Sequence, residues 1–232
     1  MHASYVSIPS HDGQSFDAYL SLPPKGQGPG LVILQEIWGV NEHIRAVADQ
    51  YAMDGYVVMA PDVFWRQQPR VDLGYDEEGS KLARHYMANL DAPNTVLDLQ
   101  ATAKALRARP EVSGKVGAVG YCMGGRLAFA LSATGTIDAA VCYYGGRIQD
   151  NLGVAPAIAG PILFHYAELD AHIPMSAVDS VKAAFAGRSN AQFHVYPGAD
   201  HGFNCWGRPM YQQRSAALAR GRTLQWLAEN MG

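Results

Sequence analysis

Apolar residues in this chain gather in short runs that alternate with longer amphipathic segments. Two runs near the start, at residues 5–8 and 16–22, are separated by a polar turn at 10–13, a pattern that predicts two antiparallel strands. Later runs are unbroken and rich in branched and aromatic side chains, which is typical of strands covered on both faces. They lie at residues 31–34, 56–60, 116–119, 139–144, 161–167 and 191–196.

Helical periodicity fills the spaces between these runs. After Asn41, a favourable N-cap residue, an apolar stripe recurs at three- and four-residue spacing until Gly55 ends it. Residues 76–90 and 94–109 predict two successive helices broken at 91–93, a further helix follows residue 126, and a last one covers about 210–230. No linker or repeat interrupts the series. We therefore expect one domain over residues 1–232, an α/β fold with a doubly wound, mostly parallel sheet of about eight strands and helices on both faces.

The segment Gly120-Tyr121-Cys122-Met123-Gly124 carries the strongest chemical signal. It joins an apolar run to the start of a helix, and its pattern Gly-x-Cys-x-Gly is the nucleophile elbow of α/β-hydrolases with cysteine in place of serine. The flanking glycines, with Gly125, make room for a strand that turns abruptly into a helix. Cys122 is thereby predicted to lie at a helix N-terminus, where the backbone amides favour a thiolate. The simpler interpretation is a buried packing cysteine.

Partners for this nucleophile follow in the chain. Asp170 comes directly after the run 161–167, and His201 lies on a glycine-flanked loop after the run 191–196. The order Cys122, Asp170, His201 is the nucleophile, acid and base order of the α/β-hydrolase fold. We expect Asp170 to orient the imidazole and His201 to assist the thiol.

Other residues compete for these roles. His172 and Asp200 are loop neighbours of the chosen acid and base, whereas His165 and His194 lie within strand runs and are interpreted as core or face residues. A histidine after the last strand is better placed as a base than one beside the acid. No group of these residues has metal-ligand spacing, so no metal is expected.

The loop after the run 31–34 offers a second signal. In this fold the end of that strand faces the elbow, so the amide of Ile37 is expected to form the oxyanion hole with the amide of Met123. Glu36 is unusual there, because a carboxylate near a thiol opposes its ionisation. It either acts on the thiol or stabilises the loop.

Composition narrows the class of protein. The chain has 232 residues, 48% of them hydrophobic, and a net charge of −3, which gives no basic footprint for nucleic acid. Three widely spaced cysteines, Cys122, Cys142 and Cys205, are expected to be reduced thiols. With no signal peptide at the N-terminus and no run of membrane-spanning length, we expect a cytoplasmic protein without membrane attachment, a monomer or small homo-oligomer.

With these features the chain resembles the dienelactone hydrolase (carboxymethylenebutenolidase) family along essentially its whole length. The resemblance rests on residues 35–41, 60–62, 115–125, 143–145 and 201–203, and above all on Gln-Glu-Ile together with Gly-Tyr-Cys-x-Gly-Gly. It implies that Cys122, His201 and Asp170 form a triad and that Glu36 keeps the thiol protonated at rest. It also implies opening of an unsaturated γ-lactone through an acyl-enzyme, with no metal or organic cofactor.

The chain departs from the family where the substrate carboxylate is held. Members use two arginines, one four residues after the catalytic histidine, where this chain has Cys205, and one near residues 76–78, which are acidic here. Arg66 and Arg208 are candidate substitutes, although either is also an ordinary surface charge. Further candidate contacts to substrate are Trp38, Tyr144 and Phe203. Loss of a bidentate clamp weakens binding of a small anion, so the sequence favours a neutral or larger ester or lactone.

The sequence thus predicts a hydrolase of small-molecule esters or lactones that uses a cysteine nucleophile. The alternatives are a general esterase or thioesterase without lactone preference, and a non-catalytic homologue that only binds its ligand. A binding protein needs no triad, so the presence of Cys122, Asp170 and His201 together argues against the last alternative.

Overall fold

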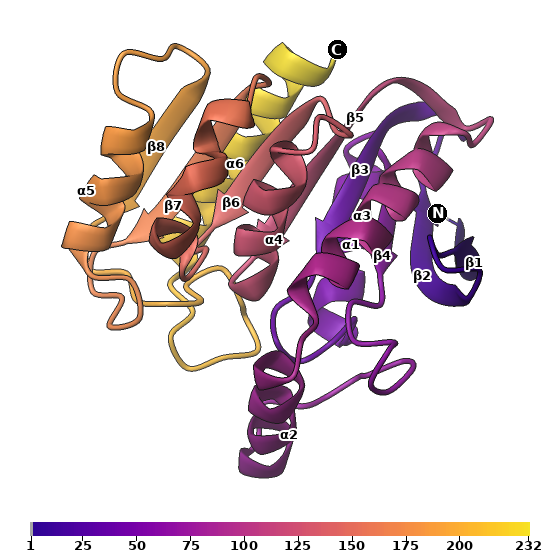
Figure 1. Cartoon of the computed structure of the whole chain (residues 1–232), viewed down its shortest axis with the longest axis horizontal. Coiled ribbons are helices and arrows are strands. Elements are labelled where there is room, and N and C mark those ends of the chain that lie inside the picture. Colours follow the sequence, from indigo (N-terminus) through magenta and orange to yellow (C-terminus); the bar gives the residue numbers. More distant parts are fainter. Residues whose placement is uncertain (1) are drawn as a thin grey trace. The chain divides into compact units, whose positions relative to one another are not determined.

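The computed structural model describes residues 2–232 and divides into two compact units after Ala118. Each unit is built from strands with helices packed against them (Figure 1). The expectation of a single domain stays a prediction.

The first unit contains the antiparallel start of the chain. Its strands are β1 (His2–Pro9), β2 (Ser15–Leu22), β3 (Gly28–Leu34), β4 (Val57–Pro61) and the first part of β5 (Val112–Tyr121). They follow the order β1-β2-β4-β3-β5. β1 pairs with β2 and β2 with β4 in antiparallel fashion, whereas β3 and β4 are parallel. The opening antiparallel pair predicted from the alternating pattern is confirmed.

Three helices accompany these strands: α1 (Glu42–Met53), α2 (Glu77–Ala88) and α3 (Ala92–Arg107). The Asn41 side chain accepts a hydrogen bond from the amide of Ile44 at 3.2 Å, as expected for an N-cap. The break between the second and third helices was expected at residues 91–93 but lies earlier. Pro93 falls in the first turn of α3, where its missing N–H needs no partner, so proline here begins a helix.

The second unit is a parallel arrangement. The end of β5 is followed by β6 (Ala139–Tyr143), β7 (Ile162–Ala167) and β8 (Ala191–Tyr196), in that spatial order. Helices α4 (Met123–Ser132) and α5 (Met175–Ala184) lie on one face, and α6 (Gln213–Met231), yellow in Figure 1, lies on the other. A kinked 3₁₀ segment, η1 (Ile148–Ala157), was not predicted.

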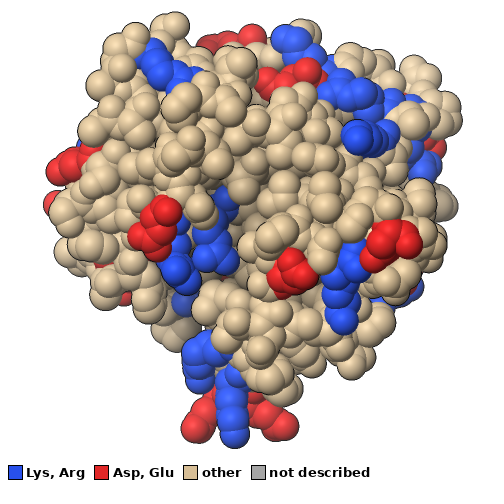
Figure 2. Space-filling view, in the orientation of Figure 1, with Lys and Arg blue, Asp and Glu red and all other residues tan. Residues whose placement is uncertain are grey.

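The predicted fold class is confirmed, with eight strands within residues 2–232 that are mostly parallel. Among the described residues, no helix has the length and apolarity needed to cross a membrane. On the face drawn in Figure 2, acidic and basic side chains both occur, and several of opposite charge lie next to one another.

The sharpest local feature is the turn from β5 to α4. The strand ends at Tyr121 and the helix begins at Met123, so Cys122 alone makes the turn, with φ 55° and ψ −115°. A side chain at position 120 would place its Cβ 1.9 Å from the carbonyl oxygen of Gly124, and one at 125 would lie 2.7 Å from that of Tyr143. Glycine at these positions is therefore a steric requirement of the turn.

This packing predicts opposite effects for two glycine substitutions. We expect Gly120→Ala to lower the free energy of unfolding by about 3 kcal/mol, because its Cβ would overlap the backbone. The matched control is Gly221→Ala in α6, where a Cβ meets nothing within 4 Å. This change should stabilise the protein by about 1 kcal/mol through helix propensity. Urea unfolding measures both, and equal stability of the two variants would contradict the steric argument.

Candidate active site

Cys122 is fixed by its backbone. Its amide donates to the carbonyl oxygen of Tyr143 in β6 at 3.0 Å, and its own carbonyl accepts from the amides of Gly125 and Arg126. The side chain stands at the first turn of α4 and is partly exposed. A thiol in this position lies near unpaired helix amides, which favour its anionic form.

His201 lies between Cys122 and Asp170. Its Nε2 is 3.1 Å from the cysteine Sγ, and its Nδ1 is 2.7 Å from Oδ2 of Asp170. Asp170 and His201 are buried, at 3% and 7% exposure. The other carboxylate oxygen of Asp170 accepts from the amides of His172 and Ile173 at 2.8 and 3.1 Å, so the acid is held by the turn that follows β7. The structure brings the three residues chosen from the sequence into one row.

Aromatic side chains enclose the imidazole. The ring of Tyr144 lies edge-on to His201, with centroids 5.1 Å apart, and Phe203 lies 5.3 Å from Tyr144. Tyr144 and Phe203 are fully buried, and Tyr144 has a positive φ of 34°, uncommon for a residue with a side chain. Tyr144, a candidate substrate contact, thus packs against the histidine, and Phe203, a second candidate, packs against Tyr144.

The competing residues have other roles in the structure. The ring of His172 stands edge-on to His201 at 5.2 Å, but its backbone amide, not its side chain, bonds Asp170. The side chain of Asp200 accepts a hydrogen bond from the backbone amide of His201 and so stabilises the loop. His165 is fully buried in β7, as interpreted from the sequence, and His194 stacks on it from β8.

The charge state of His201 reflects its two neighbours. Burial by itself lowers the pKa of the imidazole, but the negative charge on Cys122 and the hydrogen bonds to Asp170 and Cys122 outweigh burial and raise the pKa to about 10. The second unit therefore holds a thiolate–imidazolium pair whenever Cys122 is ionised. Such a pair is the attacking form of a cysteine nucleophile.

The remaining predicted residues lie in the first unit, after β3. Glu36, Ile37 and Trp38 are all buried, at 1%, 8% and 7% exposure. A carboxylate oxygen of Glu36 lies within 4.8 Å of a ring nitrogen of His43, which is buried in α1. Whether the Ile37 amide and the Glu36 carboxylate act on the cysteine stays a prediction.

Gln35 belongs to the Gln-Glu-Ile motif, but no role was predicted for it from the sequence. It is fully buried, and its Oε1 accepts from the amide of Val63 at 3.1 Å, tying the loop after β3 to the segment after β4. The available signal was a polar residue directly following an apolar run.

Arg66 is held in an ion-pair network. Its guanidinium meets both oxygens of Asp98 at 2.9 Å, reaches Asp12 at 2.6 Å and bonds the Ser10 hydroxyl. Asp98 is only 5% exposed and also accepts from the indole N–H of Trp65. Through these contacts Arg66 acts as a structural residue that links the segment after β4 to α3.

Arg208 occupies a different environment. Gly202 has φ +84°, and a Cβ there would lie 2.2 Å from a guanidinium nitrogen of Arg208. The guanidinium thus covers the backbone of the residue that follows His201, and glycine makes room for it. Cys205, at the position of the family arginine, is fully buried.

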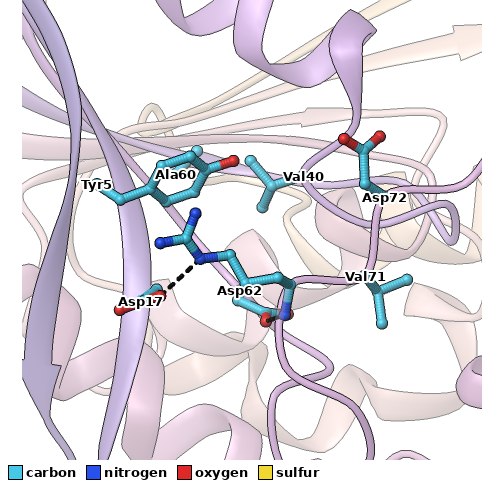
Figure 3. A pocket seen from close by; sticks show the side chains of 8 residues that line it. Tyr5, Asp17, Val40, Ala60, Asp62, Val71 and Asp72 are labelled. Carbon is cyan, nitrogen blue, oxygen red and sulfur yellow. Dashed lines mark hydrogen bonds and ion pairs between the residues drawn. The ribbon is translucent and has the colours of Figure 1, made fainter.

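A separate pocket of about 230 Å³ opens in the first unit (Figure 3). Arg70 crosses it, with Nε 2.7 Å from Asp17 and the guanidinium 3.7 Å above the ring of Tyr5. The Arg70 amide donates to Asp62, whose pKa burial raises to about 6. These groups are partners of one another, and none of the residues predicted for catalysis lines this pocket.

A cysteine on a one-residue turn between strand and helix, with an aspartate and a histidine on the loops after β7 and β8, is the arrangement of an α/β-hydrolase. The dienelactone hydrolase family model matches residues 16–231. The chain belongs to this family.

Individual relatives agree with that assignment. Carboxymethylenebutenolidase from Pseudomonas putida is 37% identical over 224 residues, which are 96% of this chain and 95% of the relative. Carboxymethylenebutenolidase 1 from Cupriavidus pinatubonensis is 33% identical with the same coverage. A crystal structure from Klebsiella pneumoniae, provisionally described as a dienelactone hydrolase, is 30% identical with a TM-score of 0.88 and covers 98% of each chain. An esterase from Pyrococcus furiosus, 19% identical with a TM-score of 0.72 over 100% of this chain and 94% of its own, shares the fold.

The coupling between His201 and Cys122 predicts how the histidine titrates. In the state of the wild type in which Cys122 is ionised, the imidazole should be protonated at pH 8, because its pKa is raised to about 10. Cys122→Ala removes the negative charge that raises the pKa, so the pKa of His201 should fall and the ring should be neutral at pH 8. NMR titration of the ring nitrogens measures this change. An imidazole that titrates identically in both proteins would show that Cys122 does not control its charge.

Proposed function

We propose that this member of the dienelactone hydrolase family hydrolyses carboxylic esters or lactones through an acyl-enzyme on Cys122. The observation that carries the proposal is the row Sγ–Nε2–Nδ1–Oδ2, with separations of 3.1 and 2.7 Å at its two hydrogen bonds. A non-catalytic binding protein has no need of this row. Family membership supplies the class of substrate.

In the proposed first step, the Cys122 thiolate adds to the substrate carbonyl carbon and the carbonyl oxygen becomes an oxyanion. The amides of Met123 and Ile37 are assigned as its hydrogen-bond donors. Collapse of this intermediate breaks the ester C–O bond, and the departing alkoxide takes the proton from Nε2 of His201. A lactone opens at this step and stays attached through its acyl group.

In the second step, water replaces the alcohol as the reacting group. Neutral His201 removes a proton from the water, which adds to the thioester carbonyl, and the Cys122 thiolate leaves as the carboxylic acid forms. Asp170 keeps Nδ1 protonated throughout, so that Nε2 faces the reacting atoms. The carboxylic acid then loses its proton to the medium.

Glu36 has a place in this proposal as the residue that governs the thiol before substrate arrives. A buried carboxylate disfavours a nearby thiolate, whereas His201 and the start of α4 favour it. On this proposal the enzyme rests with a protonated thiol and passes to the thiolate–imidazolium pair when substrate binds. The thiol is protected from oxidation in the interval.

The substrate itself is proposed more broadly than the names of the relatives suggest. Cys205 stands where an anion-binding arginine is expected, and Arg66 is occupied by Asp98 and Asp12. We therefore propose that neutral aryl esters or lactones are hydrolysed at least as well as cis-dienelactone. The second candidate function, a general esterase or thioesterase, is favoured by the same loss of a carboxylate clamp.

Replacement of the nucleophile tests the proposal. Cys122→Ala should lower kcat by about 10³-fold or more on a panel of aryl esters, small lactones and cis-dienelactone. Rapid-quench mass spectrometry of the wild type should show an acyl adduct on Cys122. Cys142→Ala is the matched control, since Cys142 is fully buried in β6 and burial raises the pKa of its thiol. Hydrolysis by Cys122→Ala at the wild-type rate would refute the mechanism, and a strong preference for cis-dienelactone would refute the proposed substrate range.

Alkylation tests the role of Glu36. At pH 7 the wild-type thiol should react slowly with iodoacetamide, and Glu36→Gln should react faster because the opposing charge is gone. Turnover should fall in the same variant. The alkylated residue is identified as Cys122 by peptide mapping. An unchanged or slower alkylation rate in Glu36→Gln would return this residue to a structural role in its loop.

A further inference from the structure

Four buried side chains in the second unit form a continuous hydrogen-bonded chain that the mechanism does not use. His165 in β7 contacts the hydroxyl of Tyr196 through Nδ1 at 2.8 Å and the hydroxyl of Thr223 through Nε2 at 2.9 Å. Thr223 in turn lies 2.7 Å from the hydroxyl of Tyr143. We call Tyr143, Thr223, His165 and Tyr196 the buried polar chain.

Burial makes this chain consequential. Each of its four residues is at most 2% exposed. A polar group in such surroundings destabilises the protein unless it is hydrogen-bonded, so removal of one link leaves its neighbours unsatisfied. The four side chains of the buried polar chain are therefore held in one arrangement, in which every link is hydrogen-bonded.

The direction of its hydrogen bonds follows from one arginine. Arg222 in α6 places its guanidinium carbon 5.3 Å from the ring centroid of Tyr196. The positive charge of this guanidinium favours a Tyr196 hydroxyl whose lone pairs face Arg222 and whose proton is donated to Nδ1 of His165. Burial lowers the pKa of His165 well below its ordinary value, so the ring is neutral. Nε2 then carries the proton and donates to Thr223, which donates to Tyr143.

The buried polar chain joins the segments that carry the triad. His165 in β7 precedes Asp170 by five residues, and Tyr196 at the end of β8 precedes His201 by five. These strands pair in parallel, with Ala167 opposite Tyr196. At the other end of the buried polar chain, the carbonyl oxygen of Tyr143 accepts a hydrogen bond from the amide of Cys122. The strands β7 and β8, which precede Asp170 and His201, therefore each contribute a residue to the buried polar chain. The end of β5, which precedes Cys122, contacts the buried polar chain through Tyr143.

We propose that the buried polar chain positions the triad, with His165 and Thr223 as positioning residues that hold the Asp170 and His201 loops in register with the turn at Cys122. This inference rests on the proposed function of the triad. Because the Cys122–His201–Asp170 row depends on two contacts near 3 Å, a small displacement of either loop lowers the rate of the chemical step. Substrate binding depends much less on that displacement.

Thr223 offers a matched pair of substitutions. Thr223→Val keeps the shape and removes the hydroxyl, so we expect kcat to fall about 10- to 100-fold with KM within threefold of the wild type. Thr223→Ser keeps the hydroxyl and should retain kcat within threefold. Tyr196→Phe removes the hydrogen bond at the other end of the buried polar chain, and its kcat should fall as in Thr223→Val. This variant keeps the test decisive if Thr223→Val does not fold.

Tyr166→Phe is the control for loss of a buried hydroxyl from the same sheet. Tyr166 lies in β7 next to His165, and its hydroxyl has no hydrogen-bond partner among the described residues. Its kcat should equal that of the wild type. Folded Thr223→Val with wild-type kcat, Thr223→Ser as impaired as Thr223→Val, or Tyr166→Phe as impaired as Tyr196→Phe would each overturn the proposal.

A spectroscopic measurement separates failure of this inference from failure of the proposed function. NMR of the wild-type imidazoles should show His165 neutral and protonated on Nε2, and Thr223→Val should shift the resonance of the Nδ1 proton of His201. Both signals are read without substrate. An inactive wild type with these signals would contradict the proposed reaction and leave the positioning role supported, whereas protonation of His165 on Nδ1 or an unmoved His201 resonance would contradict the positioning role itself.

Discussion

The backbone conformation of one residue, Cys122, determines how closely the neighbouring strand and helix must pack. A strand that becomes a helix through a single residue at positive φ brings Gly120 against Gly124, and Gly125 against β6, at distances that exclude a Cβ. The amide of Cys122 then has to be satisfied from outside α4, and the carbonyl of Tyr143 supplies the acceptor. The glycine-rich sequence, the position of β6 and the exposure of the thiol are consequences of this one turn.

Electrostatics makes the charges of Cys122, His201 and Asp170 interdependent. An isolated imidazole as buried as His201 would be neutral, yet Cys122 and Asp170 raise its pKa. Asp170 is itself stabilised by two backbone amides, so its charge does not require a second cation. The row is thus anchored in backbone at both ends, through the turn at Cys122 and the turn after β7. The imidazole of His201, in the middle of the row, is held by side chains, through its hydrogen bonds to Cys122 and Asp170.

Local patterns were sufficient for most of the fold. The Asn41 cap, the apolar stripe of α1 and the buried strands depend on neighbours within four residues, so the sequence displays them directly. β5 is longer than expected because its residues before Val116 are partly or fully exposed and carry no apolar pattern. The elbow and the order of acid and base were recognisable because this fold requires residue types at fixed points along the chain.

Long-range pairing was the part that local patterns did not contain. Arg66 meets Asp98 from 32 positions away, which changes it from a candidate ligand of substrate into a structural residue. His165 was correctly placed in the core, but its partners Tyr196 and Thr223 lie 31 and 58 positions further on. No periodicity links residues at such separations. Only the packing of α6 against the strands reveals that they form one network.

The position of Thr223 late in the chain has a consequence for synthesis. Cys122, Asp170 and His201 all precede it, so a growing polypeptide already contains the three residues proposed for catalysis before α6 is synthesised. Until α6 packs against the strands, the hydroxyl of Tyr143 and Nε2 of His165 lack the threonine that joins them in the finished structure. On the proposed positioning role, the order of translation therefore separates the synthesis of these three residues from their alignment, which awaits α6.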